Sequence, residues 1–185
     1  MKNVLQYLLI VAIITVVIGV VYGSVQQAYR TGADDPQLQL VRDMNLKLHE
    51  GKNIGQYFND TIDIAQSQAP FNALFDSNGK ALRSSGLLHD HLPELPAGVF
   101  EFAKTHNEDV FTWQPENSVR MAMVVKYSDA SPVTFVASGR SLSEVEVREH
   151  NLVTMIVIGW IICMGLLLLY CVFAYFNKER SGVNS

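Results

Sequence analysis

The sequence predicts an α+β protein in which two transmembrane helices flank a domain with a five-stranded antiparallel sheet. Two stretches of 27 residues, Asn3–Tyr29 and Asn151–Asn177, contain no Asp, Glu, Lys or Arg. A hydrocarbon core of roughly 30 Å needs about 20 apolar residues in a helix, so each stretch is long enough to cross a membrane. Between them, short apolar runs separated by turn residues predict the strands of the sheet.

The two apolar stretches divide the chain into four parts. Lys2 flanks the first stretch, and Lys178 and Arg180 flank the second. Because Lys and Arg are retained on the cytoplasmic side, both termini are expected inside the cell and the central domain outside the plasma (inner) membrane. The predicted parts are an N-terminal tail with the first transmembrane helix (1–29), an extracytoplasmic domain (30–148), the second transmembrane helix (149–177) and a short cytoplasmic tail (178–185).

The composition of the central domain limits its partners. Residues 30–150, between the two uncharged stretches, carry 11 Lys and Arg against 17 Asp and Glu, and this acidic balance argues against binding to nucleic acid. Both cysteines, Cys163 and Cys171, lie in the second apolar stretch, so no disulfide is predicted within the domain. The domain is therefore expected to be stabilised by its hydrophobic core.

The first helix of the domain is predicted from a start signal, an apolar stripe and a stop signal. Asp35 is suited to the N-cap and Pro36 to the first helical position. Apolar residues recur at four-residue spacing as far as Leu48, and Gly51 favours the end of the helix. The segment Thr31–Ala33 predicts a break between this helix and the first transmembrane helix.

A β-hairpin is the clearest strand signal. Asp76–Gly79 supplies turn residues between the runs Phe71–Phe75 and Lys80–Ser84. The other predicted elements of the domain are a helical segment within Ile54–Gln68, a helix at Ala97–His106 with Val99, Phe102 and Ala103 facing inward, and strands at Asp109–Gln114, Val119–Tyr127 and Val133–Ser138. The helices are expected to cover one face of the sheet.

A long helix is predicted to leave the sheet. Ser141 and Glu144 form a capping box, in which the serine accepts a backbone hydrogen bond and the glutamate bonds back to the start of the helix. No Pro or Gly follows before Gly159, so one continuous helix is expected from Leu142 to about Phe176.

Two motifs give the chain a family resemblance. The first is Phe75–Lys80 followed by Ser84–Gly86, and the second is Val136–Leu142 leading into an acidic helix. This arrangement resembles the extracytoplasmic PAS-like and Cache-like sensor domains of bacterial sensor histidine kinases. The resemblance implies a role in two-component-like signal transduction. Because only Asn177–Ser185 follow the second apolar stretch, the chain is expected to be a sensor region without the kinase transmitter.

The resemblance also implies a small-molecule site on the sheet, for which Arg120, Tyr127, Trp113 and Phe75 are the candidate ligand-binding residues. Arg120 stands in an otherwise apolar strand, and arginine suits carboxylate ligands. Another interpretation places Arg120 at an edge by strand alternation and Trp113 in the core.

Small residues in the apolar stretches predict close helix packing. Thr15, Gly19 and Gly23 recur every four residues in the first stretch, and Gly159 and Cys163 have the same spacing in the second. These residues could seal the two helices against each other or contact another membrane protein or a second copy of the chain.

Motifs for catalysis are absent from the sequence, so an enzyme is not predicted. His89–His91 is the best metal-binding candidate, but a solvated loop is the favoured interpretation, and neither a metal nor a cofactor is predicted. The leading hypothesis is an accessory sensor that binds a small ligand or a protein partner and passes the signal through its helices. The alternative is a structural or assembly subunit of a membrane complex.

Overall fold

The structure is a computed structural model that describes residues 2–183, and the side chains of residues 2–5, 30, 33, 175 and 177–183 lie outside its described part. The side chains of Lys2, Lys178 and Arg180, used above to predict orientation, are among these. The elements in chain order are α1 (Lys2–His49), the 3₁₀ helix η1 (Gly55–Phe58), β1 (Ile62–Asp63), β2 (Phe71–Phe75), β3 (Ala81–Ser84), β4 (Gly86–Leu87), α2 (Ala97–His106), β5 (Glu108–Glu116), β6 (Val119–Tyr127), β7 (Phe135–Ser141) and α3 (Ser143–Val183).

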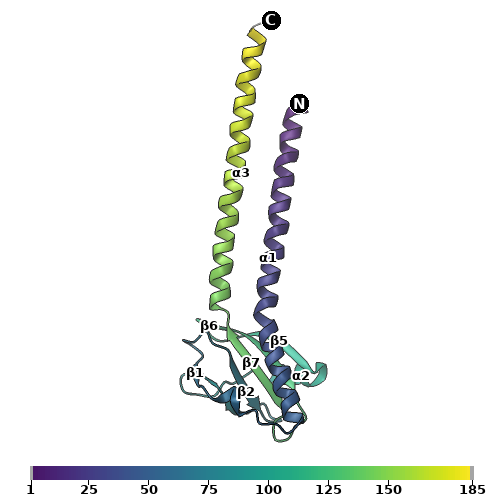
Figure 1. The fold of residues 1–185 in the computed structure, drawn as a ribbon, viewed down its shortest axis with the longest axis vertical. Coiled ribbons are helices and arrows are strands. Elements are labelled where there is room, and N and C mark those ends of the chain that lie inside the picture. The colour runs from purple at the N-terminus through teal and green to yellow at the C-terminus, as the bar shows by residue number, and fades with distance from the viewer. Residues whose placement is uncertain (1, 184–185) are drawn as a thin grey trace. The chain divides into compact units, whose positions relative to one another are not determined.

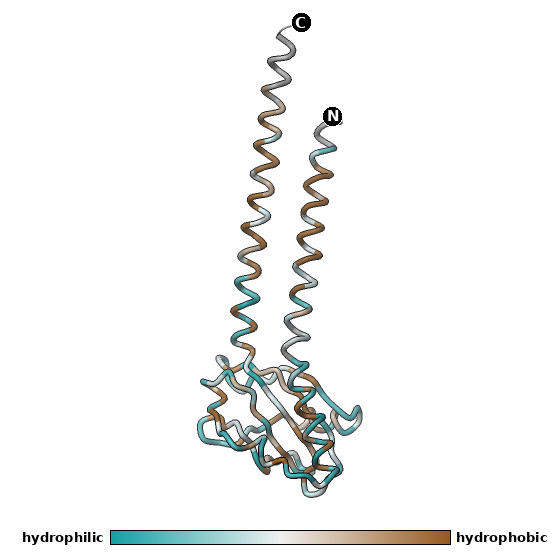
Figure 2. The backbone as a smooth tube through the Cα atoms, in the orientation of Figure 1, coloured by the Kyte–Doolittle hydropathy of each residue, from teal (hydrophilic) through white to brown (hydrophobic). Residues whose placement is uncertain are grey.

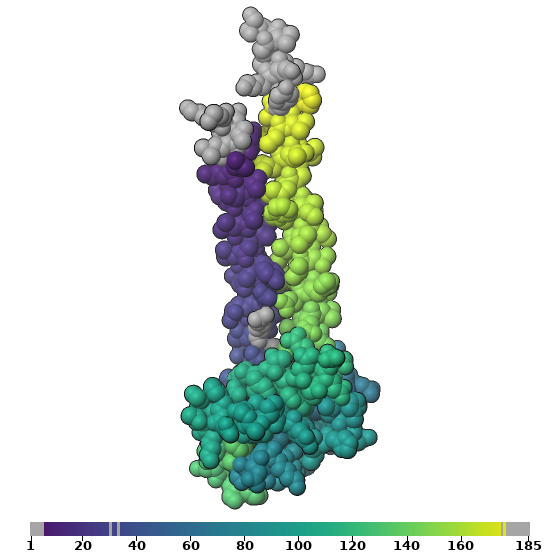
Figure 3. Space-filling view, turned by 180° about the vertical axis from the view of Figure 1, so that it is seen from behind, coloured from purple at the N-terminus to yellow at the C-terminus, as the bar shows by residue number. Residues whose placement is uncertain are grey.

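The chain forms two compact units. One consists of Met1–Ala28 and Arg148–Ser185, and the other of Tyr29–Val147. The first unit holds the apolar parts of α1 and α3, which lie side by side (Figures 1 and 3). Both helices are long and apolar enough, by length and composition, to cross a membrane, and Figure 2 shows their apolar segments.

Side-chain contacts among the described residues connect the paired helices of the first unit. The rings of Tyr7 and Tyr170 meet edge to face, with their centroids 6.3 Å apart. The indole N–H of Trp160 donates to the hydroxyl of Thr15 over 3.2 Å, and the amide of Gln26 donates to Glu149. These contacts are spread along both helices and hold them together over the length of the pair.

The helix α1 continues through the segment where a break was predicted. It runs from Lys2 to His49 and holds Pro36 in its interior, so neither the break at Thr31–Ala33 nor a helix start at Asp35 is found. A proline ring crowds the carbonyl four residues earlier, here that of Gly32, and proline has no N–H to donate, yet the helix continues past both residues. The prediction treated two helix-breaking residues as a boundary, whereas the helix accommodates both.

The end of α1 follows the prediction. Gly51 has a φ of +66°, the left-handed conformation that glycine adopts at little cost. Its N–H donates to the carbonyl of Leu48 over 3.1 Å, and the N–H of Lys52 donates to Lys47 over 2.9 Å. This pair of bonds is the Schellman motif that closes many helices.

The segment after α1 is less helical than predicted. Within Ile54–Gln68, only η1 is helical, and β1 follows it. The N–H of Ile62 donates to Ser85 and that of Ile64 donates to Leu87, so β1 pairs in parallel with β4. These amides bond across to a distant segment and are therefore not available to a local helix.

The five-stranded sheet is antiparallel throughout, in the order β3-β2-β7-β6-β5. The α+β class and the five strands are confirmed. The predicted strand Val119–Tyr127 agrees with β6, and β5 extends beyond both of its predicted ends. The strand β7 begins two residues later than predicted and ends three residues later. In β7 the strand continues through Gly139 to Ser141, where β6 still pairs with it.

The helices cover both faces of the sheet, so the prediction of a single covered face was wrong. On one face, called the α2 face, Phe100 and Ala103 of α2 pack with strand residues such as Phe71. On the other, called the α1 face, Val41 and Met44 pack with strand and loop residues. Alternation along β2 and β6 sends successive side chains to opposite faces, so each helix meets a different apolar set.

The inward face of α2 is rotated from the predicted one. Phe100 and Ala103 are buried, whereas Phe102 is 47% exposed and stacks on His106 with ring centroids 4.0 Å apart. Val99, also predicted to face inward, is partly buried. The ring centroids of Phe75 and Phe135, which pair in the sheet, lie 5.1 and 4.9 Å from that of Phe100, and these contacts favour its place in the core.

Candidate functional site

The first turn of α3 begins directly at the end of the sheet. The N–H of Leu142 donates to the carbonyl of Arg120 over 2.9 Å, which continues the β6–β7 pairing by one residue. The carbonyl of Leu142 then accepts from Glu146, which starts the helix. The chain therefore passes from strand to helix without an intervening loop.

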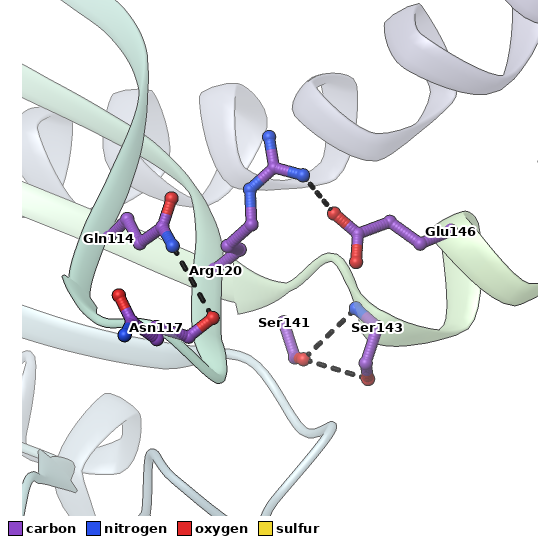
Figure 4. Close-up of polar contacts among 6 residues, drawn as sticks. All are labelled: Gln114, Asn117, Arg120, Ser141, Ser143 and Glu146. Carbon is purple, nitrogen blue, oxygen red and sulfur yellow. Dashed lines mark hydrogen bonds and ion pairs between the residues drawn. The ribbon is translucent and has the colours of Figure 1, made fainter.

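The predicted capping box at Ser141 and Glu144 does not form. The hydroxyl of Ser141 accepts from the N–H of Ser143 over 3.3 Å and donates to the hydroxyl of Ser143 over 3.0 Å (Figure 4). Glu144 instead accepts from Arg140 over 3.1 Å. Ser141 is the last residue of β7, so it is one position too early to cap a helix that begins at Ser143.

Two arginines of the sheet hold this first turn. Arg120 of β6 forms an ion pair with Glu146, and Arg140 of β7 forms one with Glu144 (Figure 4 shows the first pair). We call these four residues the α3 clasp. Neighbouring strands deliver both arginines to the α1 face, because β6 and β7 pair with Ala122 opposite Arg140.

The α3 clasp is accessible to water. Its four side chains are between 36% and 47% exposed. Exposed ion pairs contribute between about 0 and 1 kcal/mol each because water and salt screen them. The clasp therefore orients the first turn of α3 weakly, in a way that a small change in the domain could alter.

A second charged group joins α1 to the sheet on the same face. Arg42 donates to Glu108 at the start of β5 over 2.6 Å, and Lys126 of β6 lies 3.6 Å from Glu108. The hydrogen bond from Arg42 lowers the pKa of Glu108, and the charges of Arg42 and Lys126 lower it further. Desolvation acts in the opposite direction but does not overcome them.

The four predicted ligand-binding residues do not come together. Arg120 lies on the α1 face and is engaged with Glu146. Phe75, Trp113 and Tyr127 belong to the α2 face, where Phe75 is fully buried and Trp113 is 6% exposed. Odd and even positions of β6 point to opposite sides of the sheet, so Arg120 and Tyr127 cannot line one cavity.

The first resemblance motif has a structural explanation. The carboxylate of Asp76 accepts from the N–H groups of Asn78 and Lys80, each over 2.9 Å. Gly79 has a φ of +76°, and a Cβ there would lie 2.7 Å from the ring of Phe100. This turn therefore needs both the acid and the glycine, which explains the motif by the folding of the hairpin.

Both motifs meet at Phe71, which is fully buried. A Cβ added at Gly86 or at Gly139 would lie 2.6 Å from its ring. The hydroxyl of Ser138 donates to the carbonyl of Phe71 over 3.1 Å. The N–H of the next residue, Asn72, donates to the hydroxyl of Ser85 over 2.9 Å. The motif residues thus enclose one aromatic ring and its backbone.

A cleft that the sequence did not predict lies beside Trp113. Its volume is 460 Å³. Its lining residues are Leu88, His89, His91, Leu92, Pro93, Glu94, Trp113 and Pro115. A second hollow of 670 Å³ shares the segment 91–94 and also has Lys80 in its lining. Of the predicted ligand-binding residues, Trp113 is the one that borders the cleft.

A tight turn shapes one wall of this cleft. Leu88 and His91 exchange two backbone hydrogen bonds of 2.9 and 3.0 Å. Between them, His89 and Asp90 have φ values of 51° and 65°, as the two central residues of a type I′ turn require. An imidazole nitrogen of His89 lies 2.7 Å from the carboxylate of Glu116 in β5, which ties the turn to the sheet.

Within the described residues, no group of three or more His, Cys, Asp or Glu side chains could hold a metal ion. In the predicted candidate His89–His91, His89 is directed to Glu116. The two imidazoles and the carboxylate of this segment therefore do not converge on one point.

The small residues predicted to pack between the membrane helices differ in whether they face the other helix. Gly19 and Gly23 are exposed, and no neighbouring side chain lies within 4 Å of an added Cβ at either one. Thr15 bonds Trp160, while Gly159 and Cys163 are half-buried. The glycines of α1 therefore form a face that α3 does not cover.

Comparison with known proteins identified no protein similar to this chain. No family model matches this chain, and it has no match among curated proteins or solved structures. Its function must therefore be inferred from its own residues and contacts.

Proposed function

We propose that this chain is a membrane-anchored, extracytoplasmic sensor-like module with a PAS/Cache-like domain. In this proposal α1 and α3 cross the plasma (inner) membrane, both termini are cytoplasmic, and the domain binds a small ligand or a protein partner. The helices then pass the signal to another membrane protein. The length and apolarity of both helices support the membrane part of this proposal.

The observation that carries the proposal is the α3 clasp. The sheet reaches the first turn of α3 through one backbone hydrogen bond and two exposed ion pairs. That turn belongs to the same helix, Ser143–Val183, as the second apolar segment. A change in the sheet that alters Arg120 or Arg140 therefore acts on α3 directly.

The exposed glycine face of α1 supports contact with a partner helix. Small residues let helices approach closely in a membrane, and Gly19 and Gly23 are not used by α3. In the proposal, a neighbouring membrane protein or a second copy of the chain occupies this face. The same face would serve a non-sensing assembly subunit, which is the alternative function.

Crosslinking separates the two functions. A photo-reactive residue at Gly23 is introduced into the full chain in its native membranes, and the yield of crosslinked partner is measured. We expect Arg120→Glu to change the yield at least about threefold, because like charges would then face each other at Glu146. The exchange Arg120→Glu with Glu146→Arg should restore the parental yield.

The matched control is Lys104→Glu, which reverses an exposed charge on α2 outside the clasp. A yield that is the same in the parent, Arg120→Glu and the exchanged pair would refute transmission through the clasp. Together with strong crosslinking, that result would establish the assembly subunit instead.

A further inference from the structure

The cleft beside Trp113 joins an apolar lining to a single carboxylate. Its apolar lining residues are Leu88, Leu92, Pro93, Trp113 and Pro115. Small-molecule sites commonly have volumes of about 300–1,000 Å³ and a mainly apolar lining with a few polar groups. The volume of 460 Å³ falls in that range, and His89, His91 and Glu94 are its polar lining residues.

The charges at the cleft favour a cation over an anion. Glu94 is in the lining, and Glu116, which is not a lining residue, pairs with His89. None of the described residues that line this cleft is Lys or Arg, whereas Lys80 lines the neighbouring hollow. An anionic ligand would meet the carboxylate of Glu94 without a fixed positive partner, and a cationic ligand would meet a complementary charge.

The walls of the cleft are fixed before any ligand arrives. Leu88 and His91 are joined by two backbone hydrogen bonds, and His89 is held by Glu116 over 2.7 Å. Pro93 is fully buried, and Leu95, two residues on, is 9% exposed and belongs to the core. A site whose walls are already ordered loses little entropy when it binds a ligand.

We propose that this cleft binds a small organic monocation, an ammonium group carried on an aromatic or aliphatic body. The ammonium pairs with Glu94, and the body lies against Leu92 and Pro115, next to the buried ring of Trp113. The inference rests on the ligand-binding part of the proposed function and names the class of ligand.

Fluorescence can report on this cleft directly. The chain has two tryptophans, and Trp160→Phe leaves Trp113 as the sole emitter. The full chain in detergent is titrated with each probe at about pH 8. The probes are phenethylammonium, 2-phenylethanol and phenylacetate, which share a body and differ in charge. We expect saturable binding of phenethylammonium, at least about fivefold tighter than either analogue.

Two variants test the role of the carboxylate. Glu94→Gln should lower the affinity for phenethylammonium to that for the alcohol. Glu101→Gln, an exposed carboxylate on α2 outside the cleft, should leave the affinity unchanged. Detergent partitioning of the probes is the same in both variants, so the difference between them reports the site.

Three results would overturn the proposal: no saturable binding of phenethylammonium, equal or tighter binding of either analogue, or unchanged selectivity in Glu94→Gln. Each is distinguishable from failure of the proposed function, because transmission through the α3 clasp is measured separately by crosslinking at Gly23. A chain that passes the crosslinking test and rejects the ammonium probe would be a transmitter with a different input.

Discussion

The two faces of the sheet differ in how firmly they are packed. On the α2 face, the ring of Phe100 contacts those of Phe75 and Phe135, and Phe71 belongs to the same core, with Gly86 and Gly139 against its ring. On the α1 face, aliphatic residues of α1 meet a smaller group of strand and loop residues. Charged pairs, including Arg42–Glu108 and the α3 clasp, complete that face.

The α1 face also contains polar atoms that the protein leaves unbonded. The side-chain oxygens of Asn72 in β2 and of Asn45 in α1 are buried, and neither accepts a hydrogen bond. Such atoms weaken a packed interface, because their hydration is lost without replacement. The contrast indicates that the α2 face fixes the fold, while the α1 face can be altered at lower cost.

The largest expected effect comes from removing a fully buried ring of the α2 face. Phe71→Ala should lower the free energy of unfolding by about 3–5 kcal/mol, because it leaves a cavity among rigid neighbours. On the α1 face, Met44→Ala should cost about 2 kcal/mol, since a helix can move to fill part of the space. Denaturation of the full chain, followed by Trp113 fluorescence in Trp160→Phe, measures both. Equal losses at the two positions would contradict the comparison.

A smaller effect is expected from adding one methyl group. Gly139→Ala would place a Cβ against Phe71 and Met123, and we expect a loss of about 1–3 kcal/mol from overpacking. The control is Gly98→Ala in α2, where nothing lies within 4 Å of an added Cβ. Alanine there should leave stability unchanged or raise it by up to about 1 kcal/mol. Similar losses in both variants would show that the space around Phe71 is not tight.

The smallest effect is a pH dependence on the α1 face. The pKa of Glu108 is held below its ordinary value of 4.5, so its stabilising contribution is present above that pH and is lost as the pH falls through the lowered value. Glu108→Gln should therefore lower the free energy of unfolding at about pH 7 by less than about 1 kcal/mol, and it should have less effect near pH 3. Denaturation of parent and variant at both pH values measures the difference.

The comparison must be made as a difference between parent and variant, because Asp109 responds in the opposite sense. Burial raises the pKa of Asp109, so that residue becomes less favourable as the pH rises through the raised value. Its contribution cancels when parent and Glu108→Gln are subtracted. A variant that loses as much stability near pH 3 as near pH 7 would show that the carboxylate is not stabilised by Arg42.

Local signals predicted much of the fold. Alternation identified β6, the Asp76–Gly79 turn identified the first hairpin, and Ala97–His106 was found at its observed bounds. The failures arose where distant residues decide the outcome. The helix α1 continues through Gly32 and Pro36. In α2, Phe100 faces the core in place of Phe102, because its ring contacts those of Phe75 and Phe135.

The candidate site was harder to predict for the same reason. The pair Arg140 and Glu144 has the four-residue spacing of helical ion pairs, so it could have been noticed in the sequence. The pair Arg120 and Glu146 depends on the register between β6 and β7, which the sequence does not display. The cleft beside Trp113 likewise depends on how the segment 88–95 folds over β5.

The enclosure of Phe71 has a consequence for how such chains can diverge. Gly86 and Gly139 are far apart in the sequence, yet each has room only for hydrogen because the same ring lies against both. Residues that share one neighbour do not vary independently. A relative with a smaller side chain at position 71 should accept Ala at position 86, and also at 139 where residue 123 is smaller than Met, whereas one that keeps Phe should keep both glycines. Covariation among these three positions would then identify relatives of this chain even where the rest of the sequence has drifted apart.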